Sequence, residues 1–599
     1  MFNQKSKKVT KEITKKRLHD FFILIILCFA ILLVNLWYLQ IIRGKEFEQR
    51  AINNCIRSLV EEAPRGEIYD HKGKLLVTNR PAVNFAIIPA EVNDYQILAN
   101  EFSSLLAVDS TYLIDKVENL RQNPFQALTI KKDLEKEKIV AIEEKKYKFK
   151  GTILTVQPER KYLYQNLAAH VLGYVNEISE EELKTSEFRN LTVGDIVGKS
   201  GLERFYDSYL RGEKGHKEVE VDALGREIAT IHFQEPTAGN DVYLTINSDL
   251  QQYIRTLMID KKGAIMVSEP YTGKILALVS YPDYDPNIFT QQMTITQWQE
   301  IAQSKDNILC NRTIQGIYPP GSVFKLIIAI AALEEGIVDL NSKVYCPGYY
   351  QLGDSLFKCW KENGHGNQTI VEAIANSCNV FFYTMGSKLG IDKLDYYAKL
   401  FGFGEKTGID LPGELAGLVP SQEWKRKTFN QSWYPGDTIN MSIGQGFLLV
   451  TPFQIHNMLC FIANEGNYFK PAYVEKIVSK SGKVIKKFEP ELIRKIGISE
   501  NTFQIIKKGM RKVVEDGTGR SANIEEVKIA GKTGTAQNPQ GENHAWFVGF
   551  APYEKPEVCV TVFIEHGGDG SQAAAPIASN IIQKYFQLRN KEIIKAENF

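Results

Sequence analysis

The uncharged run over residues 21–42 constrains this chain more than any other feature of its sequence. It is long enough to cross a bilayer as a single helix, and Trp37 and Tyr38 near its end suit a membrane interface. A cleaved signal peptide is the rival interpretation, but the apolar run is too long for one and no small-x-small cleavage site follows it. A buried helix of a soluble domain is the other alternative. We therefore predict a transmembrane anchor over residues 21–42.

The segment before this run is strongly basic. Residues 5–17 contain one acidic side chain, Glu12, against Lys5, Lys7, Lys8, Lys11, Lys15, Lys16 and Arg17. Basic flanks of membrane helices stay on the cytoplasmic side. We therefore expect residues 1–20 to form a cytoplasmic tail, and everything after about residue 43 to lie outside the cytoplasmic membrane.

The rest of the chain has the composition of ordinary globular protein. Its 599 residues exceed what one hydrophobic core organises, so two or more domains are expected. Lys+Arg 72 against Asp+Glu 71 leaves a net charge of +1. Because there is no basic surplus, we expect no nucleic-acid partner.

The pattern of apolar residues changes near residue 236. Residues 43–235 mix short strands, charged helices and turns without a catalytic cluster, which predicts a non-catalytic, elongated α/β pedestal. Residues 236–599 predict an α/β domain long enough to bury a full core. Its expected elements are strands at 241–246, 263–267 and 275–279, a helical insertion at 368–465, strands toward 565 and a closing helix at 576–588.

A candidate nucleophile lies in this second domain. Ser322 follows Pro319-Pro320-Gly321 and is expected to open an apolar helix, with Lys325 one turn later on the same face. Serine attacks only when a base takes its proton, and a lysine of lowered pKa can be that base. The alternative is a helix start with an incidental lysine. A second Ser-x-x-Lys, at residues 355–358, is expected to be a loop.

Two further motifs follow Ser322 in the sequence. Ser377 and Asn379 lie in an expected helix over residues 370–389 and offer a hydroxyl and an amide, although Ser-x-Asn also occurs at residues 499–501 and 521–523. Alone, the motif also fits a polar interruption in a buried helix. The last motif, Lys532-Thr533-Gly534-Thr535, continues a strand-like segment, where small residues would let a substrate backbone pair with the strand. The other Lys-Ser/Thr-Gly copies, at residues 199–201, 406–408 and 480–482, lie in the pedestal, before a loop and in a surface turn.

The order Ser-x-x-Lys, Ser-x-Asn, Lys-Thr-Gly is typical of penicillin-interacting serine enzymes. Over nearly its whole length the chain resembles the class B penicillin-binding proteins, and within them the penicillin-binding protein 2 subgroup. The resemblance rests on residues 65–70, 198–203, 440–446, 451–452 and 544–552, and on the loop at 346–366 for the subgroup. It implies a penicillin-binding transpeptidase domain with a mainly antiparallel sheet, helices on both faces and a helical subdomain.

The resemblance also implies roles for the motif residues. Ser322 would be the acylated nucleophile and Lys325 its base, Ser377 would relay the proton toward the leaving amine, and Asn379 would bind the donor peptide. On the late strand, Lys532 and Thr533 would support the proton network, while Thr533, Gly534 and Thr535 would bind substrate, Thr535 at the terminal carboxylate. The backbone N–H groups of Ser322 and Thr535 would form the oxyanion hole.

The implied activity is that of an elongation-specific peptidoglycan D,D-transpeptidase in the bacterial inner membrane, with its catalytic domain in the periplasm. It would pass an acyl group from a stem peptide ending in D-Ala-D-Ala through Ser322 to an amine, would be a target of β-lactams, and allows a D,D-carboxypeptidase side activity. A glycan polymerase and scaffold proteins of the elongation complex are the implied partners. The alternatives are a septal-type transpeptidase, a serine β-lactamase or β-lactam sensor, and a catalytically idle cell-wall scaffold.

A metal site is also expected near the second motif. Cys346, Cys359, His365 and Cys378 supply three thiolates and one imidazole, a set that suits tetrahedral zinc. Some members of the resembling family hold zinc in this loop with acidic, His and Cys ligands, and Cys346 and Cys359 would replace two acidic positions. A Cys346–Cys359 disulfide with Cys378 buried and free is the alternative in an oxidising compartment, and inert cysteines are the third. We expect zinc to be structural, and no organic cofactor.

Overall fold

The computed structural model describes residues 2–47, 56–92, 94–119, 127–146, 148–221, 227–291, 293–539 and 541–597. These form two compact units. The first comprises Met1–Glu62, Ala82–Gln157 and Lys214–Pro236, and the second comprises Ala63–Pro81, Pro158–Glu213 and Thr237–Phe599. The division falls within the strands β3 (Leu75–Ile87) and β5 (Thr152–Tyr162). Parts of the expected pedestal therefore group with the expected catalytic domain, and the sequence boundary at residue 236 stays a prediction.

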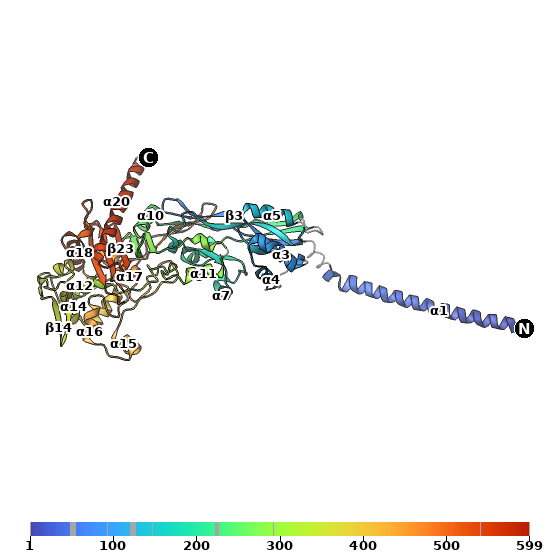
Figure 1. Cartoon of the computed structure of the whole chain (residues 1–599), viewed down its shortest axis with the longest axis horizontal. Coiled ribbons are helices and arrows are strands. Elements are labelled where there is room, and N and C mark those ends of the chain that lie inside the picture. Colours follow the sequence, from blue (N-terminus) through green and yellow to red (C-terminus); the bar gives the residue numbers. More distant parts are fainter. Residues whose placement is uncertain are drawn as a thin grey trace. The chain divides into compact units, whose positions relative to one another are not determined.

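The chain begins with a long helix, α1 (Phe2–Trp37), which continues as one π-helical turn over Tyr38–Ile42 (blue in Figure 1). Within Lys15–Ile42, a window of 18 residues has a mean hydropathy of 2.7, and none of that window is buried. Its length and composition allow it to cross a membrane, which agrees with the predicted anchor.

The first unit contains a three-stranded antiparallel sheet in the order β1-β8-β9 and a separate apolar core formed by helices and strands together. In that core, Phe85 and Phe102 stack with ring centroids 4.9 Å apart. Asp94 caps the helix that carries Phe102 by accepting from the N–H groups of Gln96 and Ile97. The elements of this unit are β1 (Ile56–Glu61), α3 (Tyr95–Leu106), α4 (Ser110–Asn119), β4 (Leu128–Lys131), α5 (Lys136–Lys146), β8 (Gly215–Val221) and β9 (Glu227–Gln234).

The second unit is built on a five-stranded antiparallel sheet in the order β12-β11-β23-β22-β21. Its strands are β11 (Lys262–Ser268), β12 (Ile275–Tyr281), β21 (Ala530–Ala536), β22 (His544–Ala551) and β23 (Val558–Glu565). Because side chains alternate along a strand, Val560 and Val562 face one apolar cluster while Cys559 and Phe563 face the other. The sheet is therefore buried on both sides.

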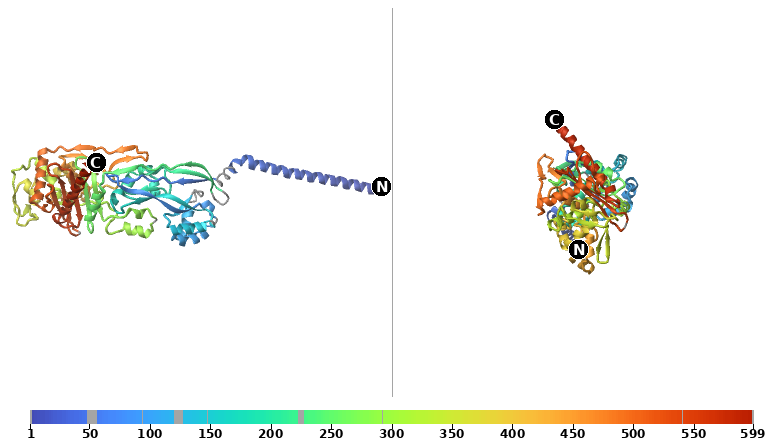
Figure 2. Two further views of the ribbon diagram at one scale, coloured as in Figure 1. Left: turned by 90° about the horizontal axis from the view of Figure 1, so that it is seen from above. Right: turned by 90° about the vertical axis from the view of Figure 1, so that its left-hand side faces the viewer.

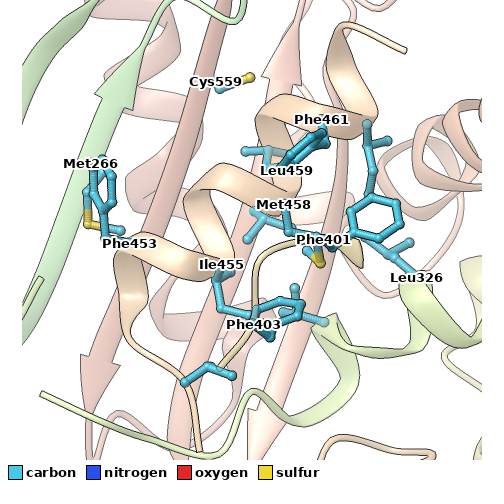
Figure 3. Close-up of a cluster of buried hydrophobic side chains, with 14 of the residues drawn as sticks. Met266, Leu326, Phe401, Phe403, Phe453, Ile455, Met458, Leu459, Phe461 and Cys559 are labelled. Carbon is cyan, nitrogen blue, oxygen red and sulfur yellow. The ribbon is translucent and has the colours of Figure 1, made fainter. Parts of the chain in front are cut away.

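Helices cover both faces of this sheet, as the sequence predicted. One face packs against α10 (Ser248–Leu257) and α20 (Ala575–Glu597), whose C-terminal end projects from the sheet (Figure 1). The other packs against α12 (Lys325–Glu334) and α17 (Pro452–Ala463). Figure 3 shows α17 crossing the strands with Phe453, Ile455 and Met458 in this layer. The helical subdomain contains α13 (Ile370–Ala375), α14 (Asn379–Leu400), α15 (Gln422–Phe429), α16 (Pro435–Met441) and α17.

The second unit has smaller strands and helices around this core. The strands are β2 (Ile68–Tyr69), β6 (Val175–Glu177), β7 (Ile196–Gly198), β10 (Asp241–Leu244), β13 (Val344–Cys346), β14 (Tyr349–Leu352), β15 (Ser355–Lys358), β16 (Gly366–Gln368), β17 (Asn467–Phe469), β18 (Val474–Val478), β19 (Val484–Lys487) and β20 (Leu492–Lys495). The helices are α6 (Ala169–Leu172), α7 (Glu180–Leu183), α8 (Gly201–Phe205), α9 (Asp207–Leu210), α11 (Ile295–Ala302), α18 (Glu500–Glu515) and α19 (Gly570–Ala573). The hairpin β18–β19, orange in Figure 2, pairs with β10, which pairs in turn with β2.

Two motifs behind the family resemblance meet in a buried ionic cluster of this unit. Arg65 donates to Glu203 Oε2 at 2.8 Å and to Asp207 Oδ1 at 2.9 Å, and Arg160 donates to Glu203 Oε1 at 2.6 Å. All four side chains are nearly inaccessible to solvent. Removing one partner of a buried ion pair leaves an uncompensated charge. This cluster therefore holds residues 65–70 against residues 198–207.

Candidate active site

Ser322 lies in a 3₁₀ turn, η5 (Gly321–Val323), immediately before α12. The sequence predicted that Ser322 is the first residue of the α-helix, whereas the structure places it in a 3₁₀ turn before the helix. Gly321 has φ +55° and its N–H donates to Gly444 O at 2.9 Å. A side chain at Gly444 would come within 2.1 Å of Gly321 O. Backbone-to-backbone packing of the 440–446 segment therefore holds the turn that presents Ser322.

Lys325 is completely buried and directs its Nζ toward the second motif. It donates to Ser377 O at 2.8 Å, to Ser377 Oγ at 3.2 Å and to Asn379 Oδ1 at 2.6 Å. Burial lowers the pKa of Lys325 to about 8, although the neighbouring Cys378 and Cys359 side chains act in the opposite direction. A lysine with this pKa is partly neutral at physiological pH, as a general base must be.

Ser377 is not inside a helix, which corrects the sequence prediction of one continuous helix over residues 370–389. It lies in a break between α13 and α14, with φ +51° in the left-handed region. A non-glycine residue in that region is strained and commonly occurs at functional sites. The break turns both the carbonyl and the hydroxyl of Ser377 toward Lys325, which a regular helix would not do.

Lys532 reaches the same hydroxyl from the sheet. Its Nζ donates to Ser377 Oγ at 3.0 Å and to Thr533 O at 2.9 Å, and the side chain is fully buried. Burial, and then the charge of Lys325, lower the pKa of Lys532 well below its usual value. The Ser377 hydroxyl therefore lies between two buried lysines. A positive charge on either lysine disfavours protonation of the other.

Thr533, Gly534 and Thr535 lie on β21, at the edge of the five-stranded sheet. A side chain at Gly534 would come within 2.8 Å of Val323 Cγ2, so glycine is needed for the strand to pack against η5. Thr535 Oγ1 accepts from Gly570 N at 3.3 Å. Because one edge of β21 pairs with β22 and the other ends the sheet, an extended peptide can add to that edge.

The structure thus brings Lys325, Ser377, Asn379 and Lys532 into direct contact, with Ser322 beside them. Among the residues that the structure describes, no hydrogen bond joins the Ser322 hydroxyl to Lys325. Hydrogen bonds of this kind often form only with substrate present. The Ser355-x-x-Lys358 copy forms strand β15 of a hairpin, rather than the expected loop.

Two residues near the site were missed by the sequence interpretation. The Thr518 hydroxyl is 2.6 Å from the Thr533 hydroxyl, and Gly570 contacts Thr535. Thr518 follows α18 and Gly570 begins α19. Neither residue belongs to a motif that spacing could have revealed, because each meets β21 only through the tertiary fold.

The cysteine-rich loop brings together the four expected metal ligands. One ligand atom from each of Cys346, Cys359, His365 and Cys378 lies within 4.8 Å of the others, and the three cysteines are free thiols. His365 Nδ1 is 3.7 Å from Cys346 Sγ and 3.5 Å from Cys359 Sγ. Tetrahedral zinc with ordinary bond lengths separates sulfur and nitrogen ligands by about 3.6 Å. The Cys378 thiol donates to Cys359, which lowers the pKa of Cys359 and raises the pKa of Cys378. This donor set fits a zinc ion.

An antiparallel sheet with a serine before its central helix and two buried lysines around a second serine defines a class of serine acyltransferases that react with penicillin. Two family descriptions match the chain: "Penicillin binding protein transpeptidase domain" over residues 263–583 and "Penicillin-binding Protein dimerisation domain" over residues 60–244. The chain belongs to the penicillin-binding protein transpeptidase family, which confirms the resemblance predicted from its motifs.

Individual relatives indicate its subgroup within the family. The chain is 35% identical to "Peptidoglycan D,D-transpeptidase MrdA" of Acinetobacter baumannii, over 96% of this chain and 88% of that protein. Its structure resembles that of penicillin-binding protein 2 (PBP2) from Helicobacter pylori in a complex with MreC. The TM-score is 0.79, with 30% identity over 89% of this chain and 99% of that one. It also resembles a chain of a peptidoglycan synthase complex, with a TM-score of 0.69 and 31% identity over 94% and 97%. These comparisons agree with the predicted penicillin-binding protein 2 subgroup.

Proposed function

We propose that this chain is a peptidoglycan D,D-transpeptidase that cross-links stem peptides during cell elongation through an acyl-enzyme at Ser322. The observation that carries the residue assignment is the Ser377 hydroxyl between the buried Nζ atoms of Lys325 and Lys532. Protonating both buried amines at the same time is energetically unfavourable. One of them is therefore available as a base next to the turn that presents Ser322.

The reaction has two half-reactions with a shared proton path. Neutral Lys325 takes the proton of Ser322 as Oγ attacks the carbonyl between the two D-alanines of the donor peptide. The Ser377 hydroxyl passes a proton to the leaving amine of the terminal D-alanine. The acyl group then moves from Ser322 to an amine of a neighbouring strand, which loses a proton along the reverse path. Attack by water instead would give D,D-carboxypeptidase activity.

Substrate alignment falls to the second motif and the sheet edge. Asn379, whose Oδ1 accepts from Lys325, would present its amide to the donor peptide. The Thr535 hydroxyl would meet the terminal carboxylate, and the absence of a side chain at Gly534 would let a peptide backbone approach the strand. The N–H groups of Ser322 and Thr535 would hold the oxyanion.

We propose further that the N-terminus lies in the cytoplasm of a bacterial cell and the catalytic domain in the periplasm. The basic residues before the apolar helix support this orientation. We also propose a glycan polymerase and scaffold proteins of the elongation complex as partners. The Helicobacter pylori relative was solved with MreC, and another relative within a peptidoglycan synthase complex.

We propose that Cys346, Cys359, His365 and Cys378 hold a structural zinc ion. What supports the site is the separation of its ligand atoms and the shared proton of Cys359 and Cys378, which a metal would replace. Four protein ligands leave no open position for catalysis. Cys378 is the residue between Ser377 and Asn379. The metal would therefore hold the backbone in the break between α13 and α14, where the second motif lies.

Covalent labelling with a fluorescent penicillin tests the nucleophile. Ser322→Ala should abolish labelling, whereas Ser355→Ala should leave it unchanged, because Ser355 lies on the exposed strand β15. Labelling of Ser322→Ala would exclude the assignment. Rapid hydrolysis of the penicillin by the wild-type protein would indicate a β-lactamase. A folded protein that takes no label would be an idle scaffold. Filaments rather than round cells on depletion would indicate septal function.

A further inference from the structure

A polar cluster lies within the apolar layer between the five-stranded sheet and α17, apart from the active site. His456 and Cys460 are four residues apart on α17 and so share one helix face. Ser268 ends β11, and Thr561 and Cys559 lie on β23. Polar groups are costly in such a layer unless they are hydrogen-bonded.

Three hydrogen bonds connect the cluster into a chain. Ser268 Oγ is 2.7 Å from His456 Nε2 and 3.3 Å from Cys460 Sγ, and His456 Nδ1 is 3.0 Å from Thr561 Oγ1. With the thiol protonated, Cys460 donates to Ser268, Ser268 donates to Nε2, and Nδ1–H donates to Thr561. Moving one proton along this chain to His456 leaves a thiolate at Cys460. An imidazole that accepts the proton of a neighbouring nucleophile is the usual way to activate it.

Cys460 can be reached from solvent. It is partly exposed and lines a surface pocket together with Ser268, His456, Asn457, Asn464 and Tyr468. Pro270, Ile275, Phe469 and Pro471 also line it, so the pocket is mainly apolar with a few polar groups, as is usual for small-molecule sites. Cys559 has no exposed surface.

The second thiol lies directly behind the first. Cys559 is the cross-strand partner of Ser268, and Figure 3 shows it on its strand in the layer that α17 covers. The Cys559 thiol donates to Cys460. That bond, with His456 and Ser268, lowers the pKa of Cys460, whereas burial and the Cys460 charge raise the pKa of Cys559. The two thiols therefore differ in both access and acidity, the two properties that order their reactivity.

We propose that Cys460 and Cys559 are a reactive thiol pair, in which Cys460 attacks a small disulfide at the solvent-exposed mouth of the pocket and Cys559 resolves the product. The Cys460 thiolate forms a bond to one sulfur of the disulfide and expels the other as a thiol. Cys559 then loses its proton and displaces the second half, forming the Cys460–Cys559 bond. Two protein thiols and one disulfide become one protein disulfide and two small thiols.

The location follows from the proposed function, because only a periplasmic domain meets oxidising disulfides routinely. The bond would join the last turn of α17 to β23. The residue before Thr451, the cap of α17, is Val450, which exchanges two backbone hydrogen bonds of 2.9 Å with Tyr318, four residues before Ser322. The pair thus lies in the layer that supports the turn presenting the nucleophile.

The test treats the reduced, full-length protein in detergent with oxidised glutathione and maps its peptides by mass spectrometry without reduction. In the wild type we expect a Cys460–Cys559 linked peptide. In Cys559→Ala, glutathione should remain on Cys460. In Cys460→Ala, Cys559 should stay unmodified. Absence of the linked peptide from the wild type, or equal reaction of Cys559 in Cys460→Ala, would overturn the proposal.

Two controls separate activation from simple access. Cys310 is also partly exposed, but burial raises the pKa of its thiol, so it should react at least about tenfold more slowly than Cys460. Ser268→Ala removes the proton relay and should slow the modification of Cys460 by about tenfold, and an unchanged rate would refute the relay. Peptide mapping does not depend on acylation, so this result stands apart from the test of Ser322. Penicillin labelling of each variant verifies its fold.

Discussion

Acylation of Ser322 should depend on pH with a midpoint set by Lys325. Burial lowers the pKa of this lysine from 10.5 to about 8. At pH 7.5 a base with that pKa is neutral in about a quarter of the molecules, compared with about one in a thousand at the usual value. The neutral fraction rises with pH, so the rate should rise as well. The gain of about 240-fold corresponds to ~3 kcal/mol.

The expected profile has a definite shape. Between pH 6 and 7 the neutral fraction, and with it the second-order rate constant for acylation, should rise about ninefold, but between pH 8 and 9 less than about twofold. The assay is stopped-flow acylation by a penicillin, whose carboxylate stays ionised across this range. Lys325→Arg serves as the control. A guanidinium does not lose its proton here, so this variant should acylate at least about a thousandfold more slowly and show no midpoint near 8.

Two results would refute this reasoning. A rate that still rises tenfold per pH unit above pH 9 would mean that Lys325 keeps its ordinary pKa despite its burial. A rate that is flat from pH 6 to 9 would mean that the base is a group other than Lys325.

Three further perturbations follow from the geometry. Lys532→Ala should reduce the acylation rate by at least about a hundredfold, because it removes a partner of the Ser377 hydroxyl. Lys406→Ala, at an exposed Lys-Thr-Gly copy, should be acylated at the normal rate. An equal loss in both variants would mean that Lys532-Thr533-Gly534 is not the functional copy. Gly444→Ala should lower both the melting temperature and the acylation rate, because a Cβ there would meet Gly321 O at 2.1 Å. At Gly482, also at positive φ but with open space around it, the same substitution should cost only about 1 kcal/mol of folding free energy. Native mass spectrometry should find one zinc ion that is lost in His365→Ala together with several degrees of melting temperature, and a metal-free protein with a mapped disulfide in the loop would exclude the site.

Much of this architecture could be predicted from local sequence. The apolar run of residues 21–42 indicates a spanning helix because bilayer thickness alone sets the length required. Two short apolar runs joined by a turn predicted the strands at 263–267 and 275–279, which the structure extends to Lys262–Ser268 and Ile275–Tyr281. The order of three short motifs predicted the family, because their chemistry is specific in combination although each is common alone.

Other features depend on contacts between residues far apart in the chain. The sheet order β12-β11-β23-β22-β21 places strands from early in the sequence beside strands from late in it. Hydrophobic periodicity and strand propensity do not determine this pairing. Residues 370–389 read as one helix because their local propensity favours it, yet the structure breaks it at Ser377. The strained backbone there is compensated by tertiary contacts, chiefly those of its carbonyl and hydroxyl with Lys325.

The sequence by itself determined which residues are candidates for the chemistry, and the tertiary structure decided which of them meet. Ser377, Lys325 and Lys532 are identifiable from their motifs, but only folding places one hydroxyl between two buried amines. Cys460 and Cys559 belong to no motif, and only the packing of α17 on β23 brings their thiols together. The physical reason is the same in both cases. Helix and strand propensities act over a few residues, whereas burial and the pKa shifts that follow from it arise when segments distant in sequence exclude water from one another.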